Sequence, residues 1–298
     1  MTERIGVVGI GVMGSAMSGH LLEAGYEVHG FDVVPDKVEA FARLGGIPEP
    51  SGAAVAIATD VVLLSLPSVK ALDEATEDVA EGAHDGLIVV EMGVFPIDAK
   101  ERSRDHFAEV GVELMDVPVS GTGLQAADAT LVVFASGSSE AFERTAPIFS
   151  VIGRSTHYLG KFGNGSIMKY IANLLVAVHN LSTAEAHALG IAAGMDPALV
   201  QKVMSDGVGS SKIFDIRGPM MVADRYDPPS ARLSIILKDA RIIKGFAQGV
   251  GAPTPLLDAA IPVYEQSEEE ALGDLDAAAL CRHLEWLAGL QRATEEPN

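Results

Sequence analysis

The sequence predicts an α/β N-terminal domain, built on a doubly wound parallel sheet, and an all-α C-terminal domain joined to it by a long interdomain helix. Three observations support this prediction. The chain has 298 residues, which is enough for two domains. Residues 1–163 alternate short β-branched runs with helical stretches, as is typical of a parallel sheet covered on both faces. Residues 164–298 are patterned for helices alone.

Six strands and five helices are expected in the N-terminal domain. The strands are Arg4–Gly9, Glu27–Asp32, Val61–Ser65, Leu87–Met92, Glu113–Asp116 and Thr130–Ala135. The helices are Met13–Ala24, Pro35–Arg43, Val69–Val79, Ile97–Val110 and Ser139–Phe149. Strands that alternate with helices in this way predict a single doubly wound sheet of six strands.

The C-terminal domain is expected to begin with a connecting helix at residues 164–193. Apolar residues recur at helical spacing from Ser166 to Ala193, and Gly194 stands where a C-terminal cap belongs. A helix of about 28 residues is about 42 Å long, which is more than one small domain needs. We therefore expect it to link the two domains. Further helices are expected to start at Asp196-Pro197, at Ser230 and at Asp274.

The charge of the chain argues against two classes of partner. Its 21 basic and 41 acidic residues give a formal charge of −20. Residues 1–160 hold 9 basic and 24 acidic residues, so 9 − 24 = −15 of this charge lies in that part of the chain. Phosphate backbones and anionic membranes repel such a chain, so neither nucleic acid nor a membrane is expected as a partner. A small anionic substrate would need a local positive site.

Cysteine usage and the N-terminus point to the cytoplasm. The single cysteine, Cys281, cannot form an internal disulfide, which fits a reducing compartment. The chain starts Met-Thr-Glu-Arg and enters an apolar run at once, without the basic leader of a signal peptide. The longest apolar stretch, Ala53–Leu66, is broken by Asp60 and is too short to span a bilayer.

A glycine-rich turn lies between the first strand and the first helix. Its residues are Gly9, Ile10, Gly11, Val12, Met13 and Gly14. The first glycine permits a tight turn, the second lets a pyrophosphate approach the backbone, and the third lets helix and strand pack closely. The helix N-terminus then offers N–H groups to the phosphates. This arrangement predicts a dinucleotide-binding Rossmann domain.

Asp32 favours NAD over NADP as the cofactor. It ends the second predicted strand, 23 residues after Gly9. A carboxylate at this place accepts hydrogen bonds from the ribose hydroxyls and repels a 2′-phosphate. No arginine follows it in the run Val33–Lys37.

Four motifs in order resemble those of the β-hydroxyacid dehydrogenase family, which includes 3-hydroxyisobutyrate dehydrogenase and tartronate semialdehyde reductase. The first is the glycine turn, and the second is Asp116-Val117-Pro118-Val119-Ser120-Gly121. The third is Gly160-Lys161-Phe162-Gly163-Asn164-Gly165, leading to Lys169 and Asn173. The fourth is Leu237-Lys238-Asp239, with Ser210-Ser211 upstream and Gly251-Ala252-Pro253-Thr254-Pro255 downstream.

Lys169 and Asn173 are the candidate catalytic residues. They are four residues apart on the predicted long helix, so their side chains project from one face, in turns where a crevice between domains is expected. A lysine desolvated near a cationic nicotinamide should have a lowered pKa, which suits proton exchange near neutral pH. The resemblance implies that Lys169 is the general acid/base and that Asn173 orients this lysine or the substrate. The alternative is an exposed helical lysine.

The candidate substrate loop is Ser120, Gly121 and Thr122. It follows a strand end at the carboxyl edge of the sheet, where ligands of open α/β folds bind. The resemblance implies that Ser120 and Gly121 hold the carboxylate of the substrate. Relatives commonly have a second glycine in place of Thr122, so this residue either adds a hydroxyl to the pocket or narrows it. A purely structural turn is the alternative.

The remaining cofactor residues follow from the resemblance. Leu66 and Pro67 resemble the segment that packs over the adenosine ribose, and Lys238 resembles a lysine that reaches the cofactor site, held there by Asp239. Val94 lines the site where relatives have a Ser-Thr pair, so no hydroxyl is available there.

Two further positions leave alternatives open. Relatives often have an aromatic residue near Ala231, and the neighbouring Arg232 either binds an anion or lies on a helix surface. His179 and His187 are eight residues apart, which does not suit a shared metal, and no metal site is expected.

These features together predict an NAD-dependent oxidoreductase that interconverts a small β-hydroxyacid and its semialdehyde or keto form. One alternative is an NADPH-dependent semialdehyde or imine reductase of the same fold. Another is a non-catalytic cofactor-binding protein. The resemblance also implies a homodimer or homotetramer.

Overall fold

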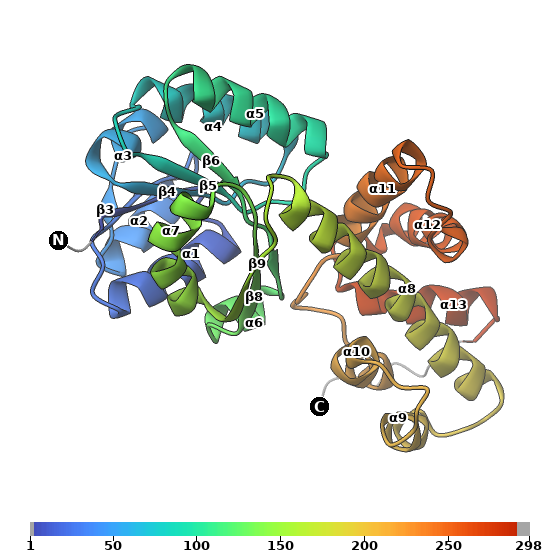
Figure 1. The fold of residues 1–298 in the computed structure, drawn as a ribbon. Coiled ribbons are helices and arrows are strands. Elements are labelled where there is room, and N and C mark those ends of the chain that lie inside the picture. The colour runs from blue at the N-terminus through green and yellow to red at the C-terminus, as the bar shows by residue number, and fades with distance from the viewer. Residues whose placement is uncertain (1–2, 291–298) are drawn as a thin grey trace. The chain divides into compact units, whose positions relative to one another are not determined.

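A parallel sheet of six strands, in the order β3-β2-β1-β4-β5-β6, forms the centre of the first part of the chain (Figure 1). The structure is a computed structural model that describes residues 3–290. The strands are β1 (Ile5–Val8), β2 (Val28–Phe31), β3 (Ile47–Pro48), β4 (Val61–Leu64), β5 (Ile88–Glu91) and β6 (Glu113–Asp116). The strand order reverses between β1 and β4, which makes the sheet doubly wound and confirms the predicted fold class.

Helices cover both faces of this sheet (Figure 1). On one face lie α1 (Val12–Glu23), α2 (Pro35–Arg43) and α7 (Ser139–Ile152), and on the other lie α3 (Gly52–Ala58), α4 (Val69–Glu81) and α5 (Ile97–Glu109). Along β4, Val61 and Leu63 face the first set, whereas Val62 and Leu64 face the second. Burial on both faces explains why these strands are continuous apolar runs.

A second sheet of three strands contradicts one prediction. It consists of β7 (Val119–Ser120), β8 (Leu131–Ala135) and β9 (Gly153–Tyr158), with α6 (Gly123–Ala127) between β7 and β8. The strand predicted at Thr130–Ala135 exists as β8, but it pairs with β7 and β9 and does not belong to the parallel sheet. The sixth parallel strand is β3, which has only two residues. Local patterning marks a strand but does not specify its partner, and this is why the prediction was wrong.

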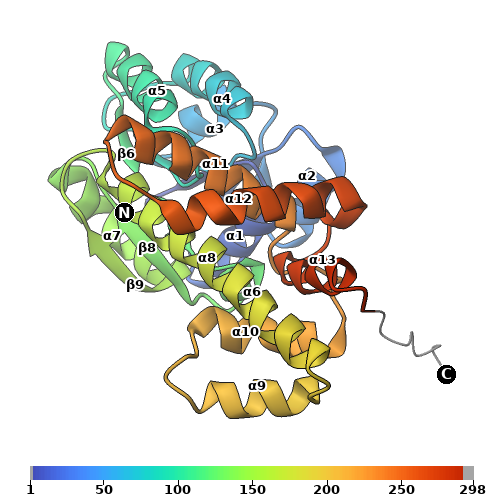
Figure 2. The same ribbon diagram turned by 90° about the vertical axis from the view of Figure 1, so that its right-hand side faces the viewer.

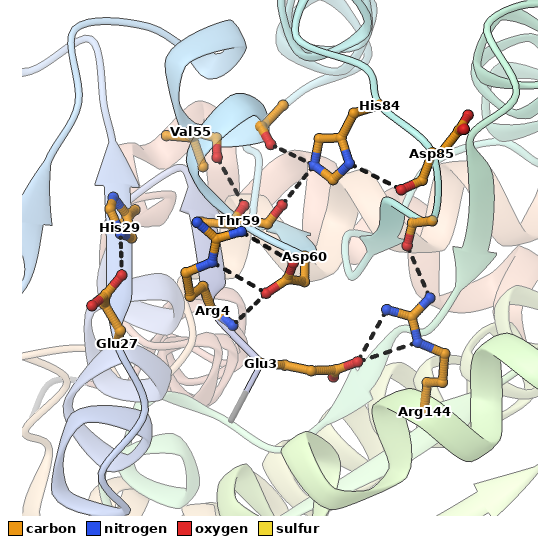
Figure 3. Close-up of polar contacts among 12 residues, drawn as sticks. Glu3, Arg4, Glu27, His29, Val55, Thr59, Asp60, His84, Asp85 and Arg144 are labelled. Carbon is orange, nitrogen blue, oxygen red and sulfur yellow. Dashed lines mark hydrogen bonds and ion pairs between the residues drawn. The ribbon is translucent and has the colours of Figure 1, made fainter. Parts of the chain in front are cut away.

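Polar contacts join the segments at the amino edge of the large sheet (Figure 3). The backbone N–H of Arg4 donates to Asp60 at 2.9 Å, and the guanidinium of Arg4 pairs with the same carboxylate at 3.2 Å. Burial works to raise the pKa of Asp60, but the hydrogen bonds from Arg4 outweigh it and hold this pKa below its ordinary value. A second ion pair, Arg144 to Glu3 at 3.0 Å, lies nearby. This edge is opposite to the one at which ligands of open α/β sheets bind.

The chain divides into two units between Tyr170 and Ile171, within α8 (Asn164–Ala192). This long helix confirms the prediction for Ser166–Ala193 to within two residues at each end, and Gly194 follows it with a φ of +78°. The division falls seven residues after residue 163, where the predicted N-terminal domain ends. The roles predicted for the two domains remain predictions.

The second unit is helical. It holds the rest of α8 together with α9 (Pro197–Ser205), α10 (Lys212–Ala223), α11 (Leu233–Gly249), α12 (Pro255–Ser267) and α13 (Leu280–Leu287). Figure 2 shows α9 beside α10 and α11 beside α12. The predicted start at Asp196-Pro197 is confirmed, because the Asp196 side chain caps α9. No helix within residues 3–290 is long and apolar enough to cross a membrane.

Two predicted helix starts in this unit are wrong for a shared reason, the buried carboxylate of Asp276. Ser230 donates to it through its N–H at 2.8 Å and its hydroxyl at 2.6 Å, and α11 begins only at Leu233. No α-helix starts at Asp274 either, because Asp276 caps a 3₁₀ turn at Ala277–Ala279 and α13 begins after it. Arg217 also pairs with Asp276, at 3.2 Å. A contact between residues distant in sequence therefore sets the start of α11, whereas a local cap forms the turn before α13.

Candidate active site

The glycine turn before α1 has the shape that a pyrophosphate requires. Gly9 has a φ of +93°, and a Cβ added to it would overlap the carbonyl oxygen of Ser65. A Cβ at Gly14 would overlap the carbonyl oxygen of Gly9, whereas one at Gly11 would meet nothing within 4 Å. No side chain caps α1, so its first-turn N–H groups are suited to an anionic ligand. These residues fit a dinucleotide.

Asp32 lies against the same turn. Its carboxylate accepts a hydrogen bond from the N–H of Ile10 at 2.8 Å and one from Val34 at 2.9 Å. The Asp32 side chain is only 7% exposed, and the Nζ of Lys37 is 3.4 Å from it. The carboxylate predicted to meet the ribose is thus fixed beside the glycine turn, with one cation near it.

The other first-unit residues expected around the cofactor follow strand ends. Leu66 follows β4, and its Cδ2 would be 3.3 Å from a Cβ on Gly9, so this side chain lies against the turn. Pro67, next along the chain, is exposed. Val12 and Met13 start α1, with Val12 largely exposed. Val94, after β5, is half-buried.

The substrate loop leads into a helix cap at Thr122. Ser120 ends β7, and Gly121 follows it with a φ of +146°. Thr122 caps α6, and its N–H and hydroxyl both donate to Oε1 of Gln125, at 2.7 and 2.6 Å. The Thr122 hydroxyl is therefore engaged in a capping box, and its place in a substrate pocket stays a prediction. Gln125 was not predicted from the sequence, although the spacing Thr-x-x-Gln is the signature of this cap.

The glycine turn and the substrate loop are neighbours within the first unit. A Cβ on Gly123 would be 2.9 Å from Cγ1 of Val12. The ring of His20 in α1 lies 3.0 Å from the carbonyl oxygen of Ala126 in α6. The two loops predicted to hold cofactor and substrate are brought together by these contacts.

Lys169 lies in the second turn of α8 and is only 8% exposed. Ser166, three residues before it, donates its N–H to Asp116 at 2.7 Å and its hydroxyl at 2.8 Å. Tyr170, next to the lysine, donates its hydroxyl to the carbonyl oxygen of Phe95. The lysine is therefore not the exposed helical lysine of the alternative interpretation.

A buried ionic cluster lies next to this helix start. The Nζ of Lys100 in α5 is 2.5 Å from Glu91 and 2.8 Å from Asp116, and these side chains are at most 1% exposed. Burial opposes the charge of the lysine, but the two carboxylates outweigh it and hold the pKa of Lys100 above its ordinary value. Burial raises the pKa of Glu91 against the pull of the ammonium group. No signal in the sequence indicated that Lys100 is buried.

In the second unit, Asp239 joins two predicted site residues. The side-chain amide of Asn173 donates to one oxygen of Asp239 at 2.7 Å, and the Nζ of Lys238 is 2.9 Å from the other. Asn173 is 9% exposed and Asp239 is 5% exposed. Arg232 is not part of this group, because it is exposed at the start of α11, 3.7 Å from Asp274.

Other polar residues of the second unit have structural partners. His187 is buried, contacts Oε1 of Gln201 at 3.0 Å and stacks on Phe214. Ser211 caps α10, and Ser210 donates to Asp215 at 3.2 Å. Within residues 3–290, no group of three or more His, Cys, Asp or Glu side chains could hold a metal ion.

Comparison with known proteins covers nearly the whole chain. Residues 4–160 match a family model described as the NAD binding domain of 6-phosphogluconate dehydrogenase. Residues 163–284 match a model described as the NAD-binding domain of NADP-dependent 3-hydroxyisobutyrate dehydrogenase.

Individual relatives match over similar lengths. The chain is 32% identical to an L-threonate dehydrogenase of Cupriavidus necator, over 95% of this chain and 96% of that protein. It is 28% identical to the chloroplastic glyoxylate/succinic semialdehyde reductase 2 of Arabidopsis thaliana, over 95% of this chain and 80% of that protein. A crystal structure of 3-hydroxyisobutyrate dehydrogenase from Salmonella typhimurium, 25% identical, superposes with a TM-score of 0.86 over 94% of this chain and 99% of that one.

The doubly wound sheet, the glycine turn and the helical second unit, together with these matches, define an NAD(P)-dependent dehydrogenase. More specifically, the chain belongs to the β-hydroxyacid dehydrogenase family. This confirms the resemblance seen in the four motifs. The family uses NAD or NADP, so the choice between the two cofactors remains to be argued from Asp32.

Proposed function

We propose that this chain is an NAD-dependent dehydrogenase that interconverts a small anionic β-hydroxyacid and its semialdehyde or keto form. The observation that supports it most is the buried Lys169, one turn after Ser166, whose two hydrogen bonds attach the start of α8 to Asp116. Asp116 begins the segment that leads to Ser120. One carboxylate thus links the candidate proton-transfer group to the candidate substrate loop.

NAD, which the glycine turn and Asp32 would hold, would supply the hydride-accepting chemistry for oxidation of the substrate carbon that bears the hydroxyl group. Lys169 takes the hydroxyl proton during oxidation and returns a proton to the carbonyl oxygen during reduction. Asn173, one turn further along α8, orients the lysine or the substrate. Lys169 is almost fully buried, which suits proton transfer, because water competes poorly for its proton.

The substrate carboxylate is assigned to the hydroxyl of Ser120 and the N–H of Gly121. The chain carries a formal charge of −20, so long-range attraction does not favour an anion. Binding of the anion therefore depends on these local donors and on the candidate site lysines, Lys169 and Lys238. The capping box leaves Thr122 without a free hydroxyl for the substrate as long as Gln125 holds it.

The cofactor is assigned to the glycine turn, with Asp32 at the ribose and with Leu66, Pro67, Val94 and Lys238 as further contacts. Asp32 supports NAD because a 2′-phosphate would meet a nearly buried carboxylate. Lys37, 3.4 Å away, weakens this repulsion without replacing the carboxylate. The assignment of Lys238 depends on the resemblance of its motif.

Two observations bear on the choice of substrate. Val94 offers no hydroxyl where relatives have a Ser-Thr pair, so the pocket differs from that of 3-hydroxyisobutyrate enzymes. The relative at 32% identity is an L-threonate dehydrogenase, which makes threonate a candidate. A homodimer or homotetramer, expected from the family, stays part of the proposal.

A substrate screen tests the proposed function. L-threonate, 3-hydroxyisobutyrate, serine, glycerate and arylated β-hydroxy acids are each supplied with NAD and with NADP, and NADH or NADPH absorbance is followed. Turnover of at least one acid with NAD is expected. Turnover with NADP and none with NAD would favour the NADPH-dependent reductase alternative. Cofactor binding without any turnover would favour a non-catalytic protein.

A further inference from the structure

The buried Lys100 cluster touches the three segments of the first unit that the proposed reaction uses. Lys100 lies in the first turn of α5 and contacts the carboxylates of Glu91 and Asp116. Its Nζ also donates to the carbonyl oxygen of Gly93 at 2.8 Å. Buried ion pairs are often no more stable than apolar residues of the same volume, so stability alone is a weak reason for three buried ionisable groups.

The first segment that the cluster holds is the start of α8. Asp116 accepts the N–H and the hydroxyl of Ser166 on its two oxygens, and it also accepts the hydroxyl of Ser136 at 3.2 Å. Ser136 in turn accepts the N–H of Gly165 at 2.9 Å. A Cβ on Gly165 would be 2.5 Å from the carbonyl oxygen of Phe134, so this turn packs directly on neighbouring backbone. The first turn of α8 therefore has little freedom to shift.

The second segment is the loop after β5, which carries Val94. The N–H of Gly93 donates to Glu91 at 2.6 Å, and the carbonyl oxygen of Gly93 accepts from Lys100. Two residues later, the carbonyl oxygen of Phe95 accepts the hydroxyl of Tyr170. The loop is thus attached to the cluster at one end and to α8 at the other.

The third segment is the substrate loop, which begins at Asp116 itself. Lys169 consequently lies between two anchored residues. Ser166 is bonded to Asp116, the partner of Lys100, and Tyr170 is bonded to Phe95, in the loop whose Gly93 accepts from Lys100.

We propose that Lys100 is a positioning residue for the reaction, one that fixes Lys169 through Asp116 and Ser166 and fixes the cofactor loop through Gly93. This proposal rests on the proposed function. Without the ammonium group, Asp116 loses its buried cationic partner and Gly93 loses its donor, so Asp116 shifts and the first turn of α8 moves with it. Proton transfer then slows, while the glycine turn, to which most of the cofactor contacts are assigned, is left intact, so cofactor affinity changes little.

The main test is the double variant Lys100→Met/Glu91→Gln. It removes one positive and one negative charge, so the net charge of the buried cluster is unchanged. With the fastest acid of the screen, kcat is expected to fall between about tenfold and a hundredfold, as small misplacements of catalytic groups do. The NADH dissociation constant should stay within about twofold, and the basic limb of the pH–rate profile should shift.

Hydrogen–deuterium exchange gives a readout that does not depend on activity. The amides at residues 165–169 are expected to exchange faster in the double variant than in the unaltered protein. If Lys169→Ala retains turnover, the proposed function fails, yet exchange still reports whether the cluster holds α8. The two failures are thereby distinguishable.

Ser103→Ala is the matched control. Ser103 is on the same helix, one turn after Lys100, and is 3% exposed. The variant loses a buried hydrogen bond of 2.5 Å between the hydroxyls of Ser103 and Thr76. This control should lower the melting temperature without changing the pH profile or the exchange at 165–169. Should the double variant fail to fold, Ser166→Ala is measured in its place by the same kinetics and exchange. It removes one hydrogen bond to Asp116 and leaves the ion pairs of Lys100. Folded variants with unchanged kcat and pH profile would show that Lys100 only stabilises the fold.

Discussion

The side-chain amide of Asn173 donates a hydrogen bond of 2.7 Å to the carboxylate of Asp239, which joins α8 to α11 within the second unit. The other oxygen of this carboxylate is 2.9 Å from the Nζ of Lys238. Asp239 therefore fixes two residues that were predicted separately, one for catalysis and one for the cofactor.

Replacing Asp239 with asparagine should reduce turnover about tenfold. A hydrogen bond to a charged group contributes roughly 1.5–3 kcal/mol, and about 1.4 kcal/mol corresponds to a factor of ten. Steady-state kinetics of Asp239→Asn measure the effect. Asp258→Asn is the control. It removes an exposed ion pair of 2.9 Å between Asp258 of α12 and Lys244 of α11, the helix that also carries Asp239. Equal turnover in the two variants would contradict a role for Asp239.

Lys169→Ala should lose most of the turnover and keep its cofactor affinity. Removing a general acid/base typically costs between roughly a hundredfold and ten-thousandfold. Kinetics and NADH fluorescence titration measure the two quantities. Lys161→Ala, an exposed lysine in the same motif, should leave both unchanged. A Lys169→Ala protein that still turns over would refute the proposed mechanism.

Asp32→Ser should relax the preference for NAD. The change removes the repulsion that a 2′-phosphate meets and leaves Lys37 nearby to attract it. The ratio of kcat/KM for NAD to that for NADP is expected to fall by about tenfold or more, equivalent to about 1.4 kcal/mol. Asp36→Ser, which alters an exposed residue of α2, provides the control. An unaltered protein that already prefers NADP would overturn the assignment of Asp32.

Gln125→Ala should release the two donors of Thr122. The N–H and hydroxyl of Thr122 both donate to Gln125, so its removal offers them to a substrate carboxylate. KM for the acid is expected to fall several-fold, while loss of the cap lowers stability by about 1 kcal/mol. Thr122→Ser keeps the cap and should change neither the KM for the acid nor the stability. A rise in KM would show instead that Gln125 itself contacts the substrate.

The second unit should lose stability in acid through Asp276. Burial opposes its charge, but Arg217 and the hydrogen bond from Ser230 outweigh burial and lower the pKa of Asp276 below its ordinary value. The unfolded chain therefore binds more protons here, so stability falls as pH drops from the ordinary pKa through the lowered one. Denaturant unfolding, followed by the fluorescence of Trp286 in α13, should show this loss as the pH falls below about 5. Trp286 is the only tryptophan of the chain.

Asp276→Asn isolates this contribution. The variant should be less stable at neutral pH, because Arg217 loses its buried partner, and its stability should depend less on pH in the acid range. Asp274→Asn, at a highly exposed neighbour, should keep the acid dependence of the unaltered protein. An identical acid dependence in Asp276→Asn would assign the loss to other carboxylates.

Much of the fold was predictable because its signals are local. The run Val61–Leu64 is apolar because both faces of β4 are covered, and the glycine turn after β1 needs no distant contact to be recognised. The long helix was also predictable, since its apolar spacing and the cap at Gly194 lie within its own sequence. The family follows from motifs of the same local kind.

The sequence by itself thus determined the class of sheet, the dinucleotide motif, the long helix and the family. Only the tertiary structure decided that β8 pairs with β7 and β9 and that Lys100 is buried between two carboxylates. Asp276 likewise set the start of α11 from a distance. Each of these depends on which side chain or strand becomes a neighbour, and periodicity along the chain carries no record of that choice, because burial and partner are properties of the folded molecule.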